Sequence, residues 1–409
     1  TQRSDVFSNY VAIEPAINFN VENSSIFSCM VVGISTNRDA WVYNYGKKSL
    51  METMRKLCSN YNLEREAYKK THKLTEKKNL VSWTVNLKKY AINDKELFVN
   101  DVCQTIGNYR PFCKQHLYYD RSFIERPGKW SYIFPTAELH NLVLAVSGIG
   151  SSKDFSLLIS DKKTCLDFNE KTQCFPLYWY EEKVPEKKAM TSLFDNAEEE
   201  EKSVEYVRHD GVTDYILNEV RSKYTSNAIT KEDIFYYVYG LLHSEDYRTQ
   251  FAADLKKMLP RLPLVEDAAD FKAFMTAGRK LGELHLDYEK RPAPIEVVVE
   301  GDISDCTVIK MKFKSKADKS TIIYNNHITI KNIPLEAYEY VVNGKSAIEW
   351  IMDRYQVKVD KASQIENNPN DWSKEHNDPK YILELLLSII TVSLETRKIV
   401  KSLPKIKFE

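Results

Sequence analysis

Asp161, Glu181 and Lys183 are the residues whose types come nearest to a reaction centre in this chain. A metal-dependent nuclease needs clustered carboxylates that hold a divalent cation, with a lysine close by. The chain contains 58 Asp and Glu residues and 58 Lys and Arg residues, so a match this loose is expected by chance. A nuclease is therefore the least supported hypothesis, and we predict no catalytic residue and no metal site.

Two further catalytic motifs are incomplete. An enzyme that methylates the amino nitrogen of a base needs an Asn/Asp-Pro-Pro-aromatic tetrapeptide, whereas residues 368–371 read Asn-Pro-Asn-Asp. A phosphate loop of the form GxxxxGK[ST] is also absent. In "SGIGSSKDF" (147–155), Gly148, Gly150 and Lys153 could hold one phosphate, although a plain β-turn is the better interpretation. Lys153 stays a candidate phosphate contact, and the emphasis moves from catalysis to binding.

The stretch "YRPFCKQHLYYDRSFIERPGKW" (109–130) interleaves basic and aromatic side chains. Its cations could follow a phosphate backbone, while Tyr119 or Trp130 could stack or wedge. Alternation around residues 117–124 places one set of side chains in a core, so the other interpretation is a strand with a solvated rim. Both interpretations hold in part. The candidate DNA contacts in this stretch are Arg110, Lys114, Arg121, Arg126, Lys129 and Trp130.

The segment "GISTNRDAWVYNYGKK" (33–48) places polar residues directly after a short apolar strand. Because Asn pairs well with adenine and Arg with guanine, Asn37 and Arg38 are candidate base contacts. The alternative is a capped turn in which Arg38 pairs with Asp39. Lys47 is a further candidate contact.

The lysines of "KMKFKSK" (310–316) share one face of a predicted strand. Lys312 and Lys314 are therefore candidate DNA contacts. A solvated face, or an edge strand that lysines protect from pairing, explains the same pattern and is the better supported interpretation.

Charge is divided unevenly along a chain whose net charge is zero. Residues 31–130 hold 19 Lys and Arg against 10 Asp and Glu, a net charge of +9. Residues 181–301 hold 17 against 25, a net charge of −8. A phosphate-binding face therefore belongs to the first region, and the acidic block is expected to face away from it or to pack on a neighbouring domain.

Composition restricts the class of protein. The chain has 409 residues, 43% of them hydrophobic and 12% aromatic, which is enough for two or three folded lobes. No apolar run approaches the roughly 18 residues of a membrane helix and no signal peptide opens the chain, so we expect a cytoplasmic protein without a membrane partner. The seven cysteines lack a CxxC pair and are expected to be free thiols.

The hydrophobic pattern predicts an α+β (mixed α/β) fold of several lobes. Strands dominate residues 117–180, helices dominate 213–288, and strands return at 295 before three closing helices. Thr230 is the expected N-cap of one helix, with Asp233 three residues on. Gly278 and Gly282, four residues apart, favour a close helix–helix contact. The predicted parts are an N-terminal segment at 1–48, a basic β-rich DNA-recognition lobe at 49–183, an acidic linker at 184–204, a helical block at 205–292 and a C-terminal strand and helix lobe at 293–409.

Eight stretches taken in this order resemble one family over residues 30 to 404. They resemble the C-terminal target-recognition (specificity) part of type ISP single-polypeptide restriction–modification enzymes. The stretches are "GISTNRDAWVYNYGKKSL", "YRPFCKQHLYYDRSFIERP", "QCFPLYWYE", "ITKEDIFYYVYGLLHSEDYRTQFAADLKKMLPRLP", "FMTAGRKLGELHLDYE", "DKSTIIYNNHITI", "VVNGKSAIEWIMDRYQVKVDKAS" and "LLLSIITVSLETRKIVKSLP".

The resemblance implies a role in recognising double-stranded DNA. The parent polypeptide would carry a nuclease, a helicase-like ATPase, a coupler and an adenine methyltransferase upstream, with residues 1–48 at the methyltransferase junction. S-adenosylmethionine, ATP and Mg are implied for that parent and no cofactor for this chain. One target adenine would be flipped toward the methyltransferase. The alternative is a scaffold between ATPase and methyltransferase with only incidental DNA contact. Base-contacting residues do not carry over, because target recognition varies between family members.

Overall fold

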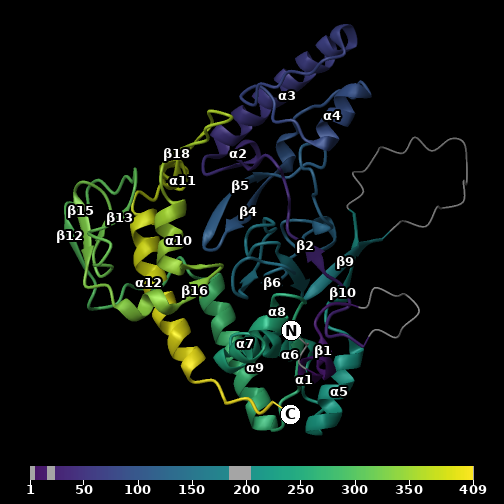
Figure 1. Cartoon of the computed structure of the whole chain (residues 1–409), viewed down its shortest axis with the longest axis vertical. Coiled ribbons are helices and arrows are strands. Elements are labelled where there is room, and N and C mark those ends of the chain that lie inside the picture. Colours follow the sequence, from purple (N-terminus) through teal and green to yellow (C-terminus); the bar gives the residue numbers. More distant parts are fainter. Residues whose placement is uncertain (1–4, 16–23, 184–203, 409) are drawn as a thin grey trace, which may run out of the picture.

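The computed structural model describes residues 5–15, 24–183 and 204–408 (Figure 1). Helices make up 37% of the structure and strands 19%, and the described residues form twelve helices and several small sheets. The predicted α+β class is therefore confirmed. All seven cysteines are free thiols, as predicted, and five of them are buried.

A four-stranded antiparallel sheet of order β2-β8-β6-β7 separates two hydrophobic cores. Successive side chains of a strand point to opposite faces. Val143 and Ala145 of β6 therefore enter the first core, whereas Leu144 and Val146 enter the second. Because both faces are covered at β6 and β7, residues 143–146 and 157–159 are continuous apolar runs. The strands are β2 (Val31–Val32), β6 (Val143–Val146), β7 (Leu157–Ser160) and β8 (Gln173–Pro176).

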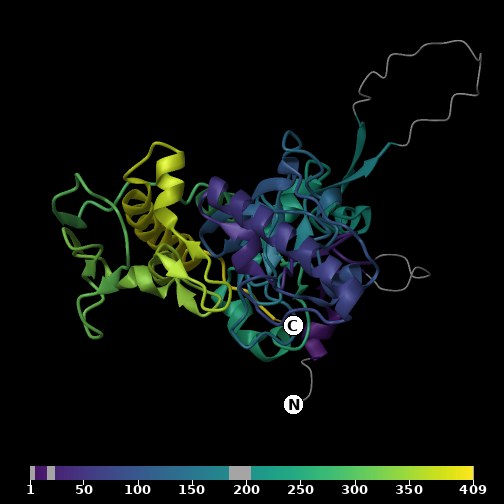
Figure 2. The same cartoon turned by 90° about the horizontal axis from the view of Figure 1, so that it is seen from above.

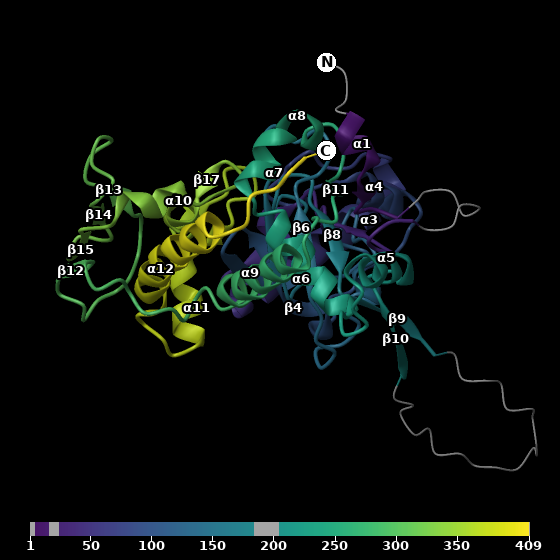
Figure 3. The same cartoon turned by 90° about the horizontal axis from the view of Figure 1, so that it is seen from below.

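A helical block covers the face of this sheet that borders the second core (Figure 3). The predicted cap is present at the start of α6: Thr230 accepts from the Asp233 backbone N–H, and the Asp233 carboxylate accepts from the Thr230 N–H. This capping box satisfies amides that the first helical turn leaves free. The helices are α5 (Asp214–Tyr224), α6 (Lys231–Leu241), α7 (Glu245–Gln250), α8 (Ala252–Leu255) and α9 (Ala268–Leu286).

Helices α6 and α9 approach each other at two glycines. A Cβ atom placed on Gly240 would lie 2.0 Å from the Phe274 carbonyl oxygen, and one on Gly278 would lie 1.8 Å from the Tyr236 carbonyl oxygen. Neither distance leaves room for a side chain. The close helix–helix contact predicted from the glycine spacing is therefore confirmed at Gly278.

The basic part of the chain forms a second sheet under a long helix. Helix α3 of this part continues to Thr71, with Arg65 buried against the protein while Glu66 and Lys69 face solvent. It stops at His72, which adopts a left-handed conformation. The elements are α2 (Asp39–Val42), β3 (Tyr43–Asn44), α3 (Lys47–Thr71), α4 (Val85–Ile92), η1 (Asp101–Cys103), β4 (Gln104–Arg110), β5 (Cys113–Tyr118) and η2 (Trp130–Tyr132).

The C-terminal lobe stands beside the rest of the molecule (Figure 2) and packs its sheet of order β12-β15-β14-β13 against helices. Strand β13 is shorter than predicted and lies at an edge of this sheet. The elements are β12 (Val298–Gly301), β13 (Lys312–Phe313), β14 (Ile322–Ile323), β15 (Ile328–Lys331), η3 (Leu335–Glu339), α10 (Ala347–Arg354), α11 (Pro369–Glu375) and α12 (Tyr381–Lys401).

Small elements tie distant segments together. The hairpin of β9 and β10 flanks the predicted linker at 184–204, nearly all of which lies outside the described residues. Strand β10 thus returns to the β-rich part of the chain before the helices begin. The pairs are β1 (Val11–Ala12) with β11 (Arg261–Leu262), β9 (Tyr178–Glu182) with β10 (Tyr206–Asp210), β16 (Val341–Val342) with β17 (Lys345–Ser346) and β18 (Lys358–Val359) with β19 (Glu366–Asn367); helix α1 spans Asp5–Asn9.

Within the described ranges, no helix combines the length and apolar character that a membrane crossing requires.

Two buried histidines where helices meet predict a pH dependence of stability. Burial lowers the pKa of His285 to about 3, from an ordinary value of 6.5, and holds that of His243 well below its usual range. Between the lowered pKa of about 3 and the ordinary value of 6.5, His285 binds a proton in the unfolded chain but stays neutral in the folded protein. The free energy of unfolding therefore falls with acidification by about 1.4 kcal/mol per pH unit and per histidine.

His285→Gln tests this dependence, since an amide can still meet the Tyr239 hydroxyl and the Thr396 hydroxyl that bind the ring. Urea unfolding at several pH values from about 7 down to about 5 gives the free energy of unfolding as a function of pH. The slope of this dependence is expected to be smaller in the variant by the equivalent of one proton. His243 keeps its own contribution in both proteins and serves as the internal control. An unchanged slope would contradict a neutral, buried His285.

Candidate nucleic-acid interface

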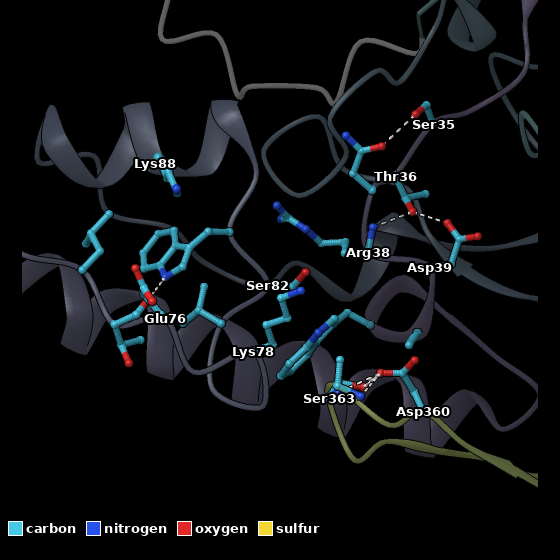
Figure 4. A pocket seen from close by; sticks show the side chains of 18 of the residues that line it. Ser35, Thr36, Arg38, Asp39, Glu76, Lys78, Ser82, Lys88, Asp360 and Ser363 are labelled. Carbon is cyan, nitrogen blue, oxygen red and sulfur yellow. Dashed lines mark hydrogen bonds between the residues drawn. The ribbon is translucent and has the colours of Figure 1, made fainter.

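A cleft of about 1020 Å³ opens in the basic part of the chain (Figure 4). One wall is the loop 35–40 with the start of α2, and the other runs from the end of α3 to α4. The turn 360–363 between β18 and β19 closes one end. Segments more than 270 residues apart therefore form a single concave surface.

The loop 35–39 is held firmly in place. Ser35 and Arg126 exchange two backbone hydrogen bonds of 3.1 Å and 2.9 Å. Thr36 Oγ1 accepts from the Arg38 N–H at 3.1 Å and donates to the Asp39 carboxylate. Asn37 takes a left-handed conformation (φ 53°), which Asn tolerates better than most residues, and its side chain is exposed. The loop thus presents Ser35 and Asn37 as polar groups on a fixed backbone.

Arg38 lies beneath this loop with 4% of its surface exposed. Its Nη2 donates to Thr84 Oγ1 at 2.7 Å, while Nε and Nη1 have no partner among the described residues. Burial lowers the pKa of Arg38 to about 10, which still leaves it charged at neutral pH. The alternative interpretation, in which Arg38 pairs with Asp39, is wrong, because that carboxylate pairs with Arg110 instead. The Glu125 carboxylate attracts this cation, but no described carboxylate forms a salt bridge with it, so Arg38 adds positive potential beneath the cleft.

The opposite wall carries exposed cations on a supported backbone. The Trp83 indole donates to the Thr75 carbonyl at 2.8 Å, and Thr84 caps α4. Lys78 and Lys88 reach the cleft from this wall (Figure 4) and have no carboxylate partner in the described part of the chain. Further exposed cations without such a partner lie on the same segments or beside Ser35. They are Lys70, Lys73, Lys77, Lys89, Arg121, Arg126 and Lys129.

The cleft also offers hydrogen-bond acceptors. The carboxylates of Asp39, Glu76, Asp167 and Asp360 line it, together with the hydroxyls of Ser35, Ser82 and Ser363. Hydrogen bonds from the backbone N–H and the hydroxyl of Ser363 lower the pKa of Asp360, so that carboxylate stays ionised. Cations that could meet phosphates thus surround a surface of mixed donors and acceptors that could meet base edges.

Three of the predicted contacts are engaged inside the protein. Arg110 lies 3.3 Å from the Asp39 carboxylate and stacks on Tyr109, with 14% of its side chain exposed. Lys114 pairs with Glu289 at 2.9 Å and is equally buried. Trp130 is fully buried and donates its indole N–H to the Val32 carbonyl at 3.1 Å. We therefore leave these three out of the proposed contact surface.

Arg38, a fourth predicted contact, lines the cleft but is buried, with 4% of its surface exposed. The remaining predicted contacts are exposed, but only some lie at the cleft. Asn37 lines it and Arg126 is paired with its loop, while Arg121 and Lys129 belong to the same exposed loop as Arg126. Four more candidates are exposed but do not line the cleft: Lys47, Lys153, Lys312 and Lys314. Whether any of these residues touches DNA stays a prediction.

The weak catalytic patterns are explained by local structure. The Ser152 and Lys153 backbone N–H groups donate to the Glu170 carboxylate at 3.0 Å and 3.2 Å, so a side chain of the protein takes the place where a phosphate was considered. Glu181 pairs with His209, and Lys183 with Glu205. No group of three metal-binding side chains occurs among the residues that the structure describes.

Sequence reasoning missed most of the second wall. His72, Lys78, Ser82 and Lys88 line the cleft, and none of them was among the predicted contacts. The lysine content of residues 69–89 was the available signal. Nothing in the sequence indicated that the turn at 360–363 would close the same cleft.

Comparison with known proteins identifies the family to which this chain belongs. The family model described as the type ISP C-terminal specificity domain matches residues 25–385. No curated protein sequence matches the chain.

Three solved structures are similar over the whole chain. The first is a nuclease-deletion mutant of the type ISP restriction-modification enzyme LlaGI in complex with a DNA substrate mimic (36% identity, TM-score 0.83, 100% of this chain and 35% of that chain). The second is the ATP-dependent type ISP restriction-modification enzyme LlaBIII bound to DNA (34% identity, TM-score 0.85, 100% and 25%). The third is a DrdV–DNA complex (25% identity, TM-score 0.81, 99% and 39%). The chain spans less than two fifths of each of these proteins.

Proposed function

The chain belongs to the type ISP C-terminal specificity domain family, and we propose that it recognises a duplex DNA sequence on behalf of a restriction–modification enzyme. The observation that carries this proposal is the cleft, whose polar interior is bordered by exposed cations without carboxylate partners among the described residues. The similar structures of LlaGI, LlaBIII and DrdV are all DNA complexes, which supports the same conclusion.

Recognition divides between two kinds of contact. Lys78, Lys88 and Arg126 would contact phosphates and so fix the position of the duplex without reading its sequence. Asn37 and the hydroxyl and carboxylate groups of the cleft would contact base edges, where an amide suits adenine and a carboxylate accepts from cytosine. The acidic helical block lies at the other end of the molecule from α3 and α4 (Figure 1), away from the phosphates.

The proposal extends to a longer polypeptide. One adenine of the bound site would be flipped toward an upstream methyltransferase, and the same recognition would direct an ATP-dependent translocase and nuclease. S-adenosylmethionine, ATP and Mg would bind to those upstream domains. A cytoplasmic location stays a prediction.

Deleting this chain from the full-length polypeptide tests the proposal. Adenine methylation of the host chromosome, mapped by sequencing, is expected to lose its sequence specificity because the upstream domains keep the chemistry and lose the reading surface. Methylation that persists at the same sites after the deletion would overturn the proposal and favour the scaffold alternative.

A further inference from the structure

A second cavity, of about 630 Å³, lies where three parts of the chain meet and shares no lining residue with the cleft. Its walls are the loop 152–156, helices α7 and α8 of the helical block, and the C-terminal lobe with residues 339–344 and the end of α12. Figure 3 shows α7 beside β17 and the end of α12. Any molecule bound here would touch all three parts.

Arg248 lines this cavity as a half-buried cation without an ion-pair partner in the described part of the chain. Its Nε–H donates to the Leu242 carbonyl at 2.6 Å, which fixes the side chain, while no hydrogen bond to a described residue uses Nη1 or Nη2. The neighbouring Arg397 differs, because the carboxylates of Glu245 and Glu339 bind it. The terminal nitrogens of Arg248 are therefore available to an anion.

Two further polar atoms at this cavity are buried and without a partner among the described residues: His243 Nε2 and the Tyr340 hydroxyl. His243 is 2% exposed, and its Nδ1–H donates to the Tyr239 carbonyl at 2.8 Å. That bond leaves Nε2 of the neutral ring as an acceptor. Tyr340 is 6% exposed and can donate. Buried polar groups are almost always hydrogen-bonded, so these atoms point to a ligand with both acceptor and donor oxygens.

We propose that this cavity binds a phosphate monoester of mononucleotide size. The phosphate oxygens accept from Arg248 and Tyr340, and a protonated oxygen or a ribose hydroxyl donates to His243 Nε2. Lys153, which forms no salt bridge with a described carboxylate, adds positive charge beside the loop 152–156. The carboxylates at the cavity oppose this charge, but each contacts a cation there: Asp154 pairs with Lys256, and Glu245 and Glu339 with Arg397.

The occupied cavity would join the β-rich part, the helical block and the C-terminal lobe. A ligand that binds only this arrangement stabilises it, and the stabilisation grows with the logarithm of the ligand concentration above the dissociation constant. The phosphate could belong to a free nucleotide or to the 5′ end of a DNA strand, because the chemistry at Arg248 is the same for both.

Isothermal titration of the full-length polypeptide with inorganic phosphate and with AMP tests the site, using the difference between wild type and Arg248→Met. We expect saturable binding that weakens about tenfold or more in the variant, in line with the loss of a charge-assisted contact. Tyr340→Phe removes the hydroxyl but keeps the ring stacked on His285, and it is expected to weaken binding several-fold. This second variant tests the site independently if Arg248→Met does not fold. Lys272→Met, on an exposed face of α9 outside this cavity, is the matched control and should bind as wild type.

A second arm compares 5′-phosphorylated and 5′-hydroxyl oligonucleotides. A preference for the phosphorylated strand that Arg248→Met removes assigns the phosphate to a DNA end, and AMP binding without such a preference assigns it to a free nucleotide. Binding of all these probes that neither Arg248→Met nor Tyr340→Phe changes, or an experimental structure at millimolar AMP with only ordered water in the cavity, would overturn the proposal.

Discussion

Reversing the charge of Lys78 and Lys88 to Glu is expected to weaken duplex binding by the full-length enzyme about 100-fold at physiological salt. Both side chains line the cleft and are exposed, and neither has a carboxylate partner among the described residues. Each phosphate contact that is lost also removes the release of a counterion. The dependence of log affinity on log salt concentration should therefore become shallower by about two.

The matched control is Lys272→Glu with Lys280→Glu on α9. It makes the same charge change at exposed lysines of the acidic helical block, outside the cleft. Fluorescence anisotropy at several salt concentrations should give nearly wild-type affinity for this control. Equal losses in the two double variants would mean that net charge and not the cleft governs binding, and would contradict the assignment.

Gly278→Ala is expected to lower the free energy of unfolding by about 3 kcal/mol. The added methyl would lie 1.8 Å from the Tyr236 backbone oxygen, so α6 and α9 would have to move apart along their contact. Overpacking of this kind costs about 1–3 kcal/mol and more where backbone must shift. The second core lies around these helices and would loosen with them.

Gly282→Ala, one turn further along α9, is the control for this substitution. Its new methyl would meet a tyrosine ring atom at 3.0 Å and nothing else closer than 3.6 Å, and a ring can rotate or shift. Alanine also favours the helix by about 1 kcal/mol over glycine, which offsets part of the contact. Urea unfolding should give Gly278→Ala a much lower free energy of unfolding than Gly282→Ala. Similar midpoints would show that the helices accommodate a side chain at Gly278.

Local features of the fold could be predicted because nearby residues determine them. Thr230 and Asp233 specify the start of α6 within one turn, and the Gly278 spacing indicated a close helix contact. The apolar runs of β6 and β7 indicated strands, although only the structure shows that both faces are buried and that they border different cores.

The cleft could not be predicted because distant contacts create it. Its walls come from the segments 35–40, 72–88 and 360–363, and no local pattern joins them. The same limit explains why Arg110 and Lys114 were expected at a DNA surface. Their carboxylate partners include Asp39, 71 residues away, and Glu289, 175 residues away. A basic stretch in a sequence shows its charge and not the partners that neutralise it.

The most direct test is an experimental structure of the full-length enzyme bound to a duplex that contains its methylated sequence. The duplex is expected to lie against the cleft, with Lys78 and Lys88 next to phosphates and Asn37 facing the base edges. A duplex held instead by Lys312 and Lys314 of the C-terminal lobe, with the cleft turned away from it, would contradict the proposed interface.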